Sequence, residues 1–183
     1  MKDNSVNNEG GNEMNKEVNN MNMNDGDMST IIDLVNKMKY EVSAEQMAEL
    51  AGCATPLTQT EFCDWHAKID EMDFSSDDRS WINDEVVAKL RSTLHQVADK
   101  SREMGDRIVR FGKRIVEFVM DAVRRYPQTT KALVVVAALM FLASLIPFIG
   151  GIVQSLVMFI GGGVALLRFV GELSDNMSAH RIA

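Results

Sequence analysis

The segment from Ala132 to Leu167 constrains this chain most, because it contains 36 residues without one ionisable side chain. A bilayer core of about 30 Å takes about 20 residues of helix, so the segment is too long for one span and fits two. A proline and a pair of glycines within 147–151 divide it into halves at about 128–146 and 151–170. The pattern predicts a transmembrane helical hairpin within residues 127–170.

Basic residues lie close to both ends of this hairpin, with Arg124, Arg125 and Lys131 near its start and Arg168 near its end. Basic residues close to membrane spans favour the cytoplasmic side. We therefore expect an integral protein of a plasma or inner membrane, with both termini in the cytoplasm. Residues 171–183 would form a short cytosolic tail.

Small residues and one proline predict where the hairpin helices pack closely. These are Pro147, Gly150, Gly151, Ser155, Gly161 and Ala165. They could pack the second helix against the first, or they could support a lateral oligomer or a pore.

Residues 1–28 differ from the rest, with nine asparagines, six acidic residues and no apolar run. Such a segment cannot bury enough surface to offset the entropy of ordering, so we expect a disordered tail. It lacks the apolar core of a secretory signal. The two cysteines of the chain are too few for a disulfide framework and fit a reducing compartment.

Residues 29–79 predict short helices in an acidic domain. Apolar residues recur at helical spacing up to about Tyr40, and capping boxes at 43–46 and 58–61 predict two further helix starts. Residues 29–100 carry a net charge of −7 (7 basic and 14 acidic). The stretch 45–78 would meet a protein partner, with Trp65 or Trp81 as an anchor if exposed.

Residues 80–126 carry an apolar stripe with alternating steps of three and four, interrupted only at Ser101, which predicts one long, coiled-coil-like helix. The stripe comprises Val87, Leu90, Leu94, Val97, Met104, Ile108, Phe111, Ile115 and Phe118. It could pack on the preceding short helices or form a homotypic coiled coil. Gly105 and Gly112 count against the coiled coil because each weakens a helix by about 1 kcal/mol relative to Ala.

The end of that helix is basic and amphipathic, as in helices that lie on anionic membrane surfaces. The expected membrane-surface contacts are Arg107, Arg110, Lys113, Arg114, Arg124, Arg125 and Lys131. The alternative is a solvated basic face that sets the membrane orientation.

No motif indicates an enzyme. Cys53, Cys63 and His66 are zinc-type ligands but lack a clear fourth, so we expect no metal and no cofactor. The acidic charge of residues 29–100 opposes binding to nucleic acid.

The sequence thus predicts an all-α protein, with a small cytosolic helical domain, a long helical stalk and a C-terminal two-helix transmembrane hairpin. The expected function is a membrane-anchored, non-enzymatic adaptor or regulator that presents its acidic domain to a protein partner. The alternative is a membrane-permeabilising effector, holin-like or translocator-like, whose hairpin oligomerises in the bilayer. Amphipathic helices followed by an apolar hairpin near the C-terminus resemble, in outline only, pore-forming colicin domains, although no sequence motif of that family is present.

Overall fold

The computed structural model describes residues 23–52, 59–74, 79–103 and 106–181, and all regular secondary structure within them is helical. This confirms the all-α prediction. The helices are α2 (Asp25–Glu41), α3 (Ala44–Gly52), α4 (Gln59–Asp70), α5 (Asp84–Glu103), α6 (Asp106–Arg125), α7 (Lys131–Leu145), α8 (Pro147–Phe159) and α9 (Gly163–Arg181).

Side chains at the helix starts explain several of these boundaries. The Asn24 carboxamide accepts a hydrogen bond from the amide of Asp27 and caps α2, and Asn83 accepts from Val86 in the same way before α5. The capping box predicted at 43–46 is confirmed. The backbone N–H of Gln46 donates to Ser43 Oγ at 3.1 Å, and the backbone N–H of Ser43 donates to Gln46 Oε1 at 3.1 Å. The box predicted at 58–61 lies outside the described side chains.

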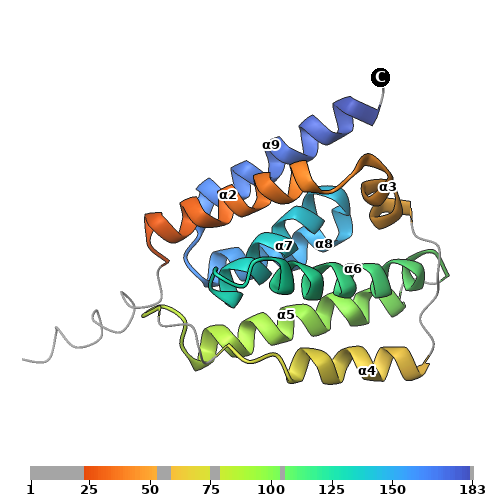
Figure 1. Cartoon of the computed structure of the whole chain (residues 1–183), viewed down its shortest axis with the longest axis horizontal. Coiled ribbons are helices and arrows are strands. Elements are labelled where there is room, and N and C mark those ends of the chain that lie inside the picture. Colours follow the sequence, from red (N-terminus) through yellow and green to blue (C-terminus); the bar gives the residue numbers. More distant parts are fainter. Residues whose placement is uncertain (1–22, 53–58, 75–78, 104–105, 182–183) are drawn as a thin grey trace, which may run out of the picture.

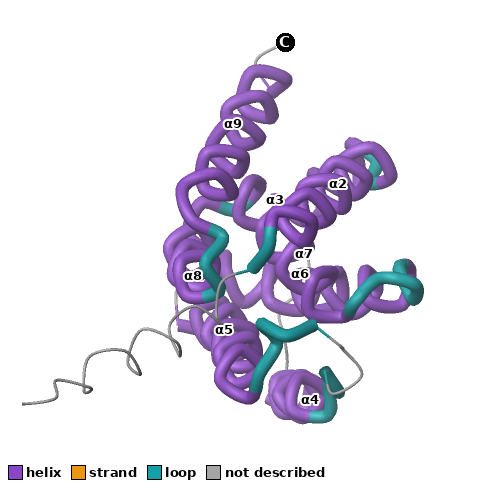
Figure 2. Tube along the Cα trace, turned by 90° about the vertical axis from the view of Figure 1, so that its left-hand side faces the viewer, coloured by secondary structure: helices purple, strands orange, loops and turns teal. Residues whose placement is uncertain are grey.

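Helix α7 lies at the centre of the bundle (Figure 1). It packs against α2 and α9 on one side and against α6 and α8 on others, with smaller contacts to α3 and α5. Helix α4 packs on α5 at the periphery, and the view along the bundle in Figure 2 shows it separated from the central helix. The chain therefore wraps its most apolar helix in amphipathic ones.

The prediction of a single long helix over 80–126 is wrong. The structure has two helices, α5 and α6, which pack side by side (Figure 1). In this arrangement the apolar stripes of both helices can face the same core. One straight helix of that length would extend beyond the bundle, and half of its apolar residues would have no core to pack against. Residues 104–105, which include Gly105, separate the two helices and lie outside the described part.

The second half of the expected hairpin also differs from the prediction. Helix α8 begins at Pro147, whose fixed φ suits the first turn of a helix, and it ends at Phe159. Gly161 and Gly163 have φ values of 78° and 56°, which side chains other than glycine rarely adopt, and they turn the chain into α9. Residues 151–170 therefore belong to two helices. None of the helices in the described ranges combines the length and apolarity needed to cross a membrane.

Candidate functional site

The most unusual feature of the fold is the complete enclosure of α7. Every side chain from Ala132 to Leu145 is buried, so the helix has no polar face toward solvent. On one side, the ring of Phe141 stacks on Phe118 of α6 with 5.2 Å between ring centroids. Helices buried all round are typical of the centre of a large core or of a membrane span.

Polar contacts hold the segments that lead into α7. The carboxylate of Asp27 in α2 is fully buried, pairs with the Arg79 guanidinium and accepts a hydrogen bond from Trp81 Nε1 at 2.6 Å. Arg79 Nε also donates to Thr130 Oγ1 at 3.4 Å, and Lys131 Nζ donates to the Asp73 carbonyl at 2.9 Å. These contacts tie the start of α7 to α2 and to the loop before α5.

A second polar cluster joins the ends of α2 and α6. The Tyr126 hydroxyl donates to Glu41 Oε2, and Arg125 Nη1 lies 3.7 Å from the same oxygen. The pKa of Tyr126 is raised to about 12. Burial of the phenol is the largest cause, and the hydrogen bond to Glu41 is the next largest.

The outer face of α8 stays exposed although it belongs to the uncharged segment. Met158 and Phe159 are exposed, as is Val164 at the start of α9. Lys89 of α5 donates a hydrogen bond from Nζ to Ser155 Oγ at 3.1 Å and lies 5.7 Å from the centroid of the Phe159 ring.

The small residues expected to pack the hairpin are distributed differently. Gly151, Ser155 and Ala165 are exposed, and a Cβ atom at Gly150 or Gly151 would meet no atom within 4 Å. Ser155 instead accepts the hydrogen bond from Lys89 of α5, and Ala165 belongs to α9 rather than α8. The tight position is instead Gly162, where a Cβ atom would lie 2.5 Å from Leu166 Cδ1. Pro147 starts α8 and Gly161 forms the turn after it.

The apolar stripe of 80–126 supplies core residues to α5 and α6. Leu90, Leu94, Val97 and Ile115 are buried, and Val87 and Phe118 pack against them. These residues pack within the chain, but α5 and α6 pack mainly on each other, with α6 on α7 and α5 on α8, and the preceding helices α3 and α4 contribute smaller contacts. The side chains of Met104, Ile108 and Phe111 lie outside the described part.

The basic residues expected at a membrane surface are described only in part. Arg124 and Arg125 are exposed at the end of α6, and Lys131 is half-buried at the start of α7. The side chains of Arg107, Arg110, Lys113 and Arg114 are not among those described.

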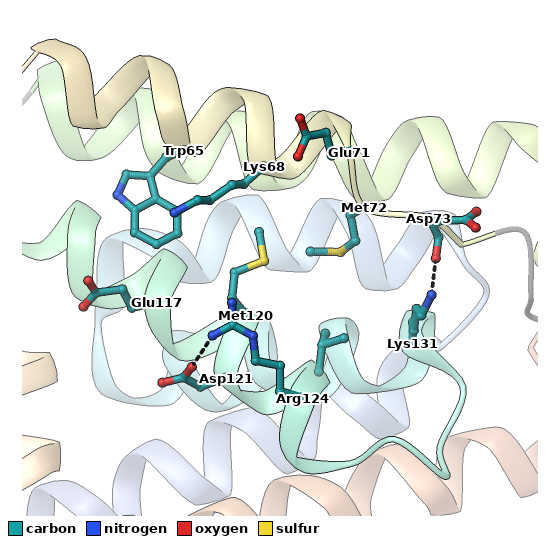
Figure 3. A pocket seen from close by; sticks show the side chains of 11 residues that line it. Trp65, Lys68, Glu71, Met72, Asp73, Glu117, Met120, Asp121, Arg124 and Lys131 are labelled. Atoms are coloured by element: carbon teal, nitrogen blue, oxygen red, sulfur yellow. Dashed lines mark hydrogen bonds and ion pairs between the residues drawn. The ribbon is translucent and has the colours of Figure 1, made fainter.

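A groove of about 640 Å³ runs between α4 and α6 (Figure 3). Trp65 and Met120 contribute apolar surface, while Arg124, paired with Asp121, and Lys131 line the side toward α7. The two tryptophans expected as partner anchors are buried, with exposed fractions of 8% for Trp65 and 2% for Trp81. Neither therefore offers the exposed anchor that the sequence analysis expected.

The sequence analysis missed a cluster between α4 and α5. The imidazole of His66 stacks on that of His95, with 4.5 Å between centroids and 18° between planes. Asp70 and Asp99 lie at the outer ends of the pair. The signal was present, because both helices carry a histidine followed four residues later by an aspartate.

The metal ligands weighed in the sequence do not converge in the described residues. Cys63 is exposed on α4, and Cys53 lies outside the described part. Among the residues described, no group of three or more His, Cys, Asp or Glu side chains is arranged to hold a metal ion.

The candidate functional site is therefore the apolar helix α7 together with the contacts that keep it enclosed. Comparisons with known protein families, with curated proteins and with solved structures find no match for this chain.

Proposed function

We propose that this protein permeabilises a membrane, and that its amphipathic helices hold the apolar segment 132–167 until the bundle opens and the segment enters a bilayer. The observation that carries this proposal is the burial of every side chain from Ala132 to Leu145 within a shell formed mainly by α2, α6, α8 and α9. An uncharged helix with no polar face is suited to two environments, the centre of a protein and the interior of a bilayer.

The packing of α2 favours this proposal over the membrane-anchored adaptor. Ile31, Val35 and Met38 of α2 are fully buried, and α2 packs mainly on α7. An adaptor whose hairpin stays in lipid would leave this face without its partner. The buried hairpin and the inserted hairpin are therefore alternative states of the same segment, and the adaptor remains the second candidate.

The inserted helices would need bounds different from those of the bundle. The 15 residues of α7 extend over about 22 Å at 1.5 Å per residue, which is shorter than a bilayer core of about 30 Å. The halves 128–146 and 151–170 have the required length, and their charged residues, Lys131 and Arg168, lie near their outer ends. Insertion would therefore extend α7 at its start and join α8 to the beginning of α9.

Insertion of the segment is tested by placing a charge at a position where the bundle tolerates it and the interior of a bilayer does not. Met158 is 55% exposed in the bundle but lies near the middle of the expected second span, so Met158→Lys should leave the fold intact. A lysine at the centre of a membrane helix costs about 2.5–3.5 kcal/mol on insertion scales. Tyr40→Lys is the matched control, because Tyr40 is 88% exposed on α2 and lies outside the segment.

Release of an encapsulated dye from vesicles of equal parts phosphatidylglycerol and phosphatidylcholine would be measured between pH 5 and 8. We expect the native chain and Tyr40→Lys to release dye at some pH in this range, and Met158→Lys to release it at least tenfold more slowly. Equal release by all three proteins would exclude insertion of this segment. Protein that resists carbonate extraction from membranes yet releases no dye would instead support the adaptor.

A further inference from the structure

The two stacked histidines form a continuous polar chain that joins α4 to α5. His95 Nδ1 lies 2.6 Å from His66 Nδ1, and His95 Nε2 lies 2.8 Å from Asp70 Oδ1. At the other end, His66 Nε2 lies 3.2 Å from Asp99 Oδ1. The order is aspartate, imidazole, imidazole, aspartate, and each histidine faces the aspartate of the other helix.

This geometry limits where the pair can carry protons. An ionised carboxylate only accepts hydrogen bonds, so His95 Nε2, at hydrogen-bond distance from Asp70, carries a proton. The approach of His66 Nε2 to Asp99 is an ion-pair distance and does not by itself place a proton on that atom. The two Nδ1 atoms are within hydrogen-bond distance, which requires one proton between them, given by one ring and accepted by the other.

Protonation of both rings is incompatible with the contact. It would place two N–H groups and two positive charges face to face across 2.6 Å. The contact therefore weakens when both imidazoles are charged. Histidine is the side chain that ordinarily changes charge between about pH 5 and 8.

The neighbouring charged side chains described on α4, α5 and α6 have other contacts or line the groove. On α4, Lys68 Nζ lies over the Trp65 ring at 4.3 Å, and Glu71 lines the groove on the α6 side. On α5, Arg91 donates to the Met72 carbonyl at 2.9 Å. The charges that α6 turns toward α4, Glu117, Asp121 and Arg124, line the same groove. Among the described side chains, Asp70 and Asp99 are the carboxylates at ion-pair distance from the rings.

The position of α4 makes its attachment sensitive to this contact. Helix α4 packs on α5, and its Trp65 side chain forms a small separate core with Ala98 and Val116. Near its end, α4 also places Ile69 in the main core, and Figures 1 and 2 show α4 at the edge of the bundle. The polar contact therefore adds to two apolar contacts in holding α4 on α5.

We infer that the histidine pair, His66 and His95, is a proton-operated contact that holds α4 on α5 near neutral pH and releases α4 on acidification. Release exposes the Trp65 core and removes the outer support of α5, which itself packs on α6, α7 and α8. The idea that release of α4 triggers membrane entry rests on the proposed function. The pH dependence of the contact between α4 and α5 does not depend on that function.

The contact is tested by hydrogen exchange of the full chain without lipid, at pH 8, 7, 6 and 5, corrected for intrinsic exchange rates. We expect protection of the α4 amides to be high at pH 8 and 7 and to fall at least tenfold by pH 5, while α2 amides change less than twofold. The double change His66→Phe with His95→Phe removes both ionisable rings and keeps two aromatic ones. His95→Gln removes one ionisable ring, keeps a donor toward Asp70 and leaves His66 able to titrate. The matched control is His180→Phe, at the third histidine of the chain.

In the double variant we expect α4 protection to lose its pH dependence, in His95→Gln we expect the dependence to weaken, and in the control we expect it to remain. If α4 protection in the native chain does not change between pH 7 and 5, the inference is wrong. It is equally wrong if the variants keep the native pH profile.

Dye release from the same vesicles separates this inference from the proposed function. Acid-dependent release of α4 without dye release would support the histidine contact and overturn the membrane function. Dye release with pH-independent protection of α4 would overturn the contact and leave the function standing.

Discussion

The phenol of Tyr126 donates a hydrogen bond to the carboxylate of Glu41, with 2.5 Å between Oη and Oε2. These residues are 85 positions apart in the sequence and join the end of α6 to the end of α2. Because both helices cover α7, the bond helps to close the shell around the apolar segment at this end.

The first prediction concerns alkaline pH. Burial and the Glu41 carboxylate raise the pKa of Tyr126 to about 12 from an ordinary value of 10.0. The folded state thus keeps a proton that the unfolded chain loses, and stability should fall as the pH rises from about 10 to 12. Urea unfolding at pH 9, 10 and 11 should show this fall in the native chain and a smaller one in Tyr126→Phe. An equal fall in both proteins would assign the effect to other groups.

A second prediction addresses the buried carboxylate of Asp27. Asp27→Asn removes the negative charge that faces Arg79 and weakens the acceptor for Trp81 Nε1. Breaking a buried ion pair costs about 3–5 kcal/mol, and the partial exposure of Arg79 favours the lower end, about 3 kcal/mol. Asp25→Asn, at an exposed position of the same helix turn, should change stability by less than about 0.5 kcal/mol. Similar unfolding midpoints for the two variants would show that the Asp27 contacts contribute little.

The glycines of the uncharged segment give a third prediction, with opposite signs at two positions. At Gly162 an alanine Cβ would lie 2.5 Å from Leu166 Cδ1 and 3.1 Å from Val157 Cγ1, so Gly162→Ala should destabilise the bundle by about 1–3 kcal/mol. At Gly151, within α8, the added methyl group would meet nothing, and alanine should stabilise the helix by about 0.5–1 kcal/mol. Thermal unfolding of both variants checks the signs, and a stabilised Gly162→Ala would contradict the packing described at the turn.

The prediction of the fold from sequence succeeded where local chemistry decides the structure. The uncharged segment, the break at Pro147 and the capping box at Ser43 are local signals, and each marks an actual feature of the structure. Local signals could not decide whether the uncharged segment is buried in protein or in lipid. Burial in protein and burial in lipid favour the same uncharged composition, so the sequence pattern fits both.

The missed features depend on the register between helices. The stripe over 80–126 has the same spacing whether it lies on one long helix or on two that pack together, and Gly105 between them was read only as a weak point. Likewise, His66 and Asp70 on one helix and His95 and Asp99 on another are ordinary pairs four residues apart. Only the side-by-side packing of α4 and α5 brings them into one chain of contacts.

The last prediction links the stability of the bundle to membrane activity. Leu139 is fully buried in α7, and Leu139→Ala should destabilise the bundle by about 2–5 kcal/mol through lost contacts and a residual cavity. Because alanine is also apolar and uncharged, the segment keeps its suitability for a bilayer. If opening of the bundle limits entry, Leu139→Ala should release dye faster than the native chain and at higher pH. Val164→Ala, at a position that is 61% exposed, is the control and should alter neither unfolding nor release. A destabilised Leu139→Ala with native release rates would mean that the enclosure of α7 does not restrain membrane entry.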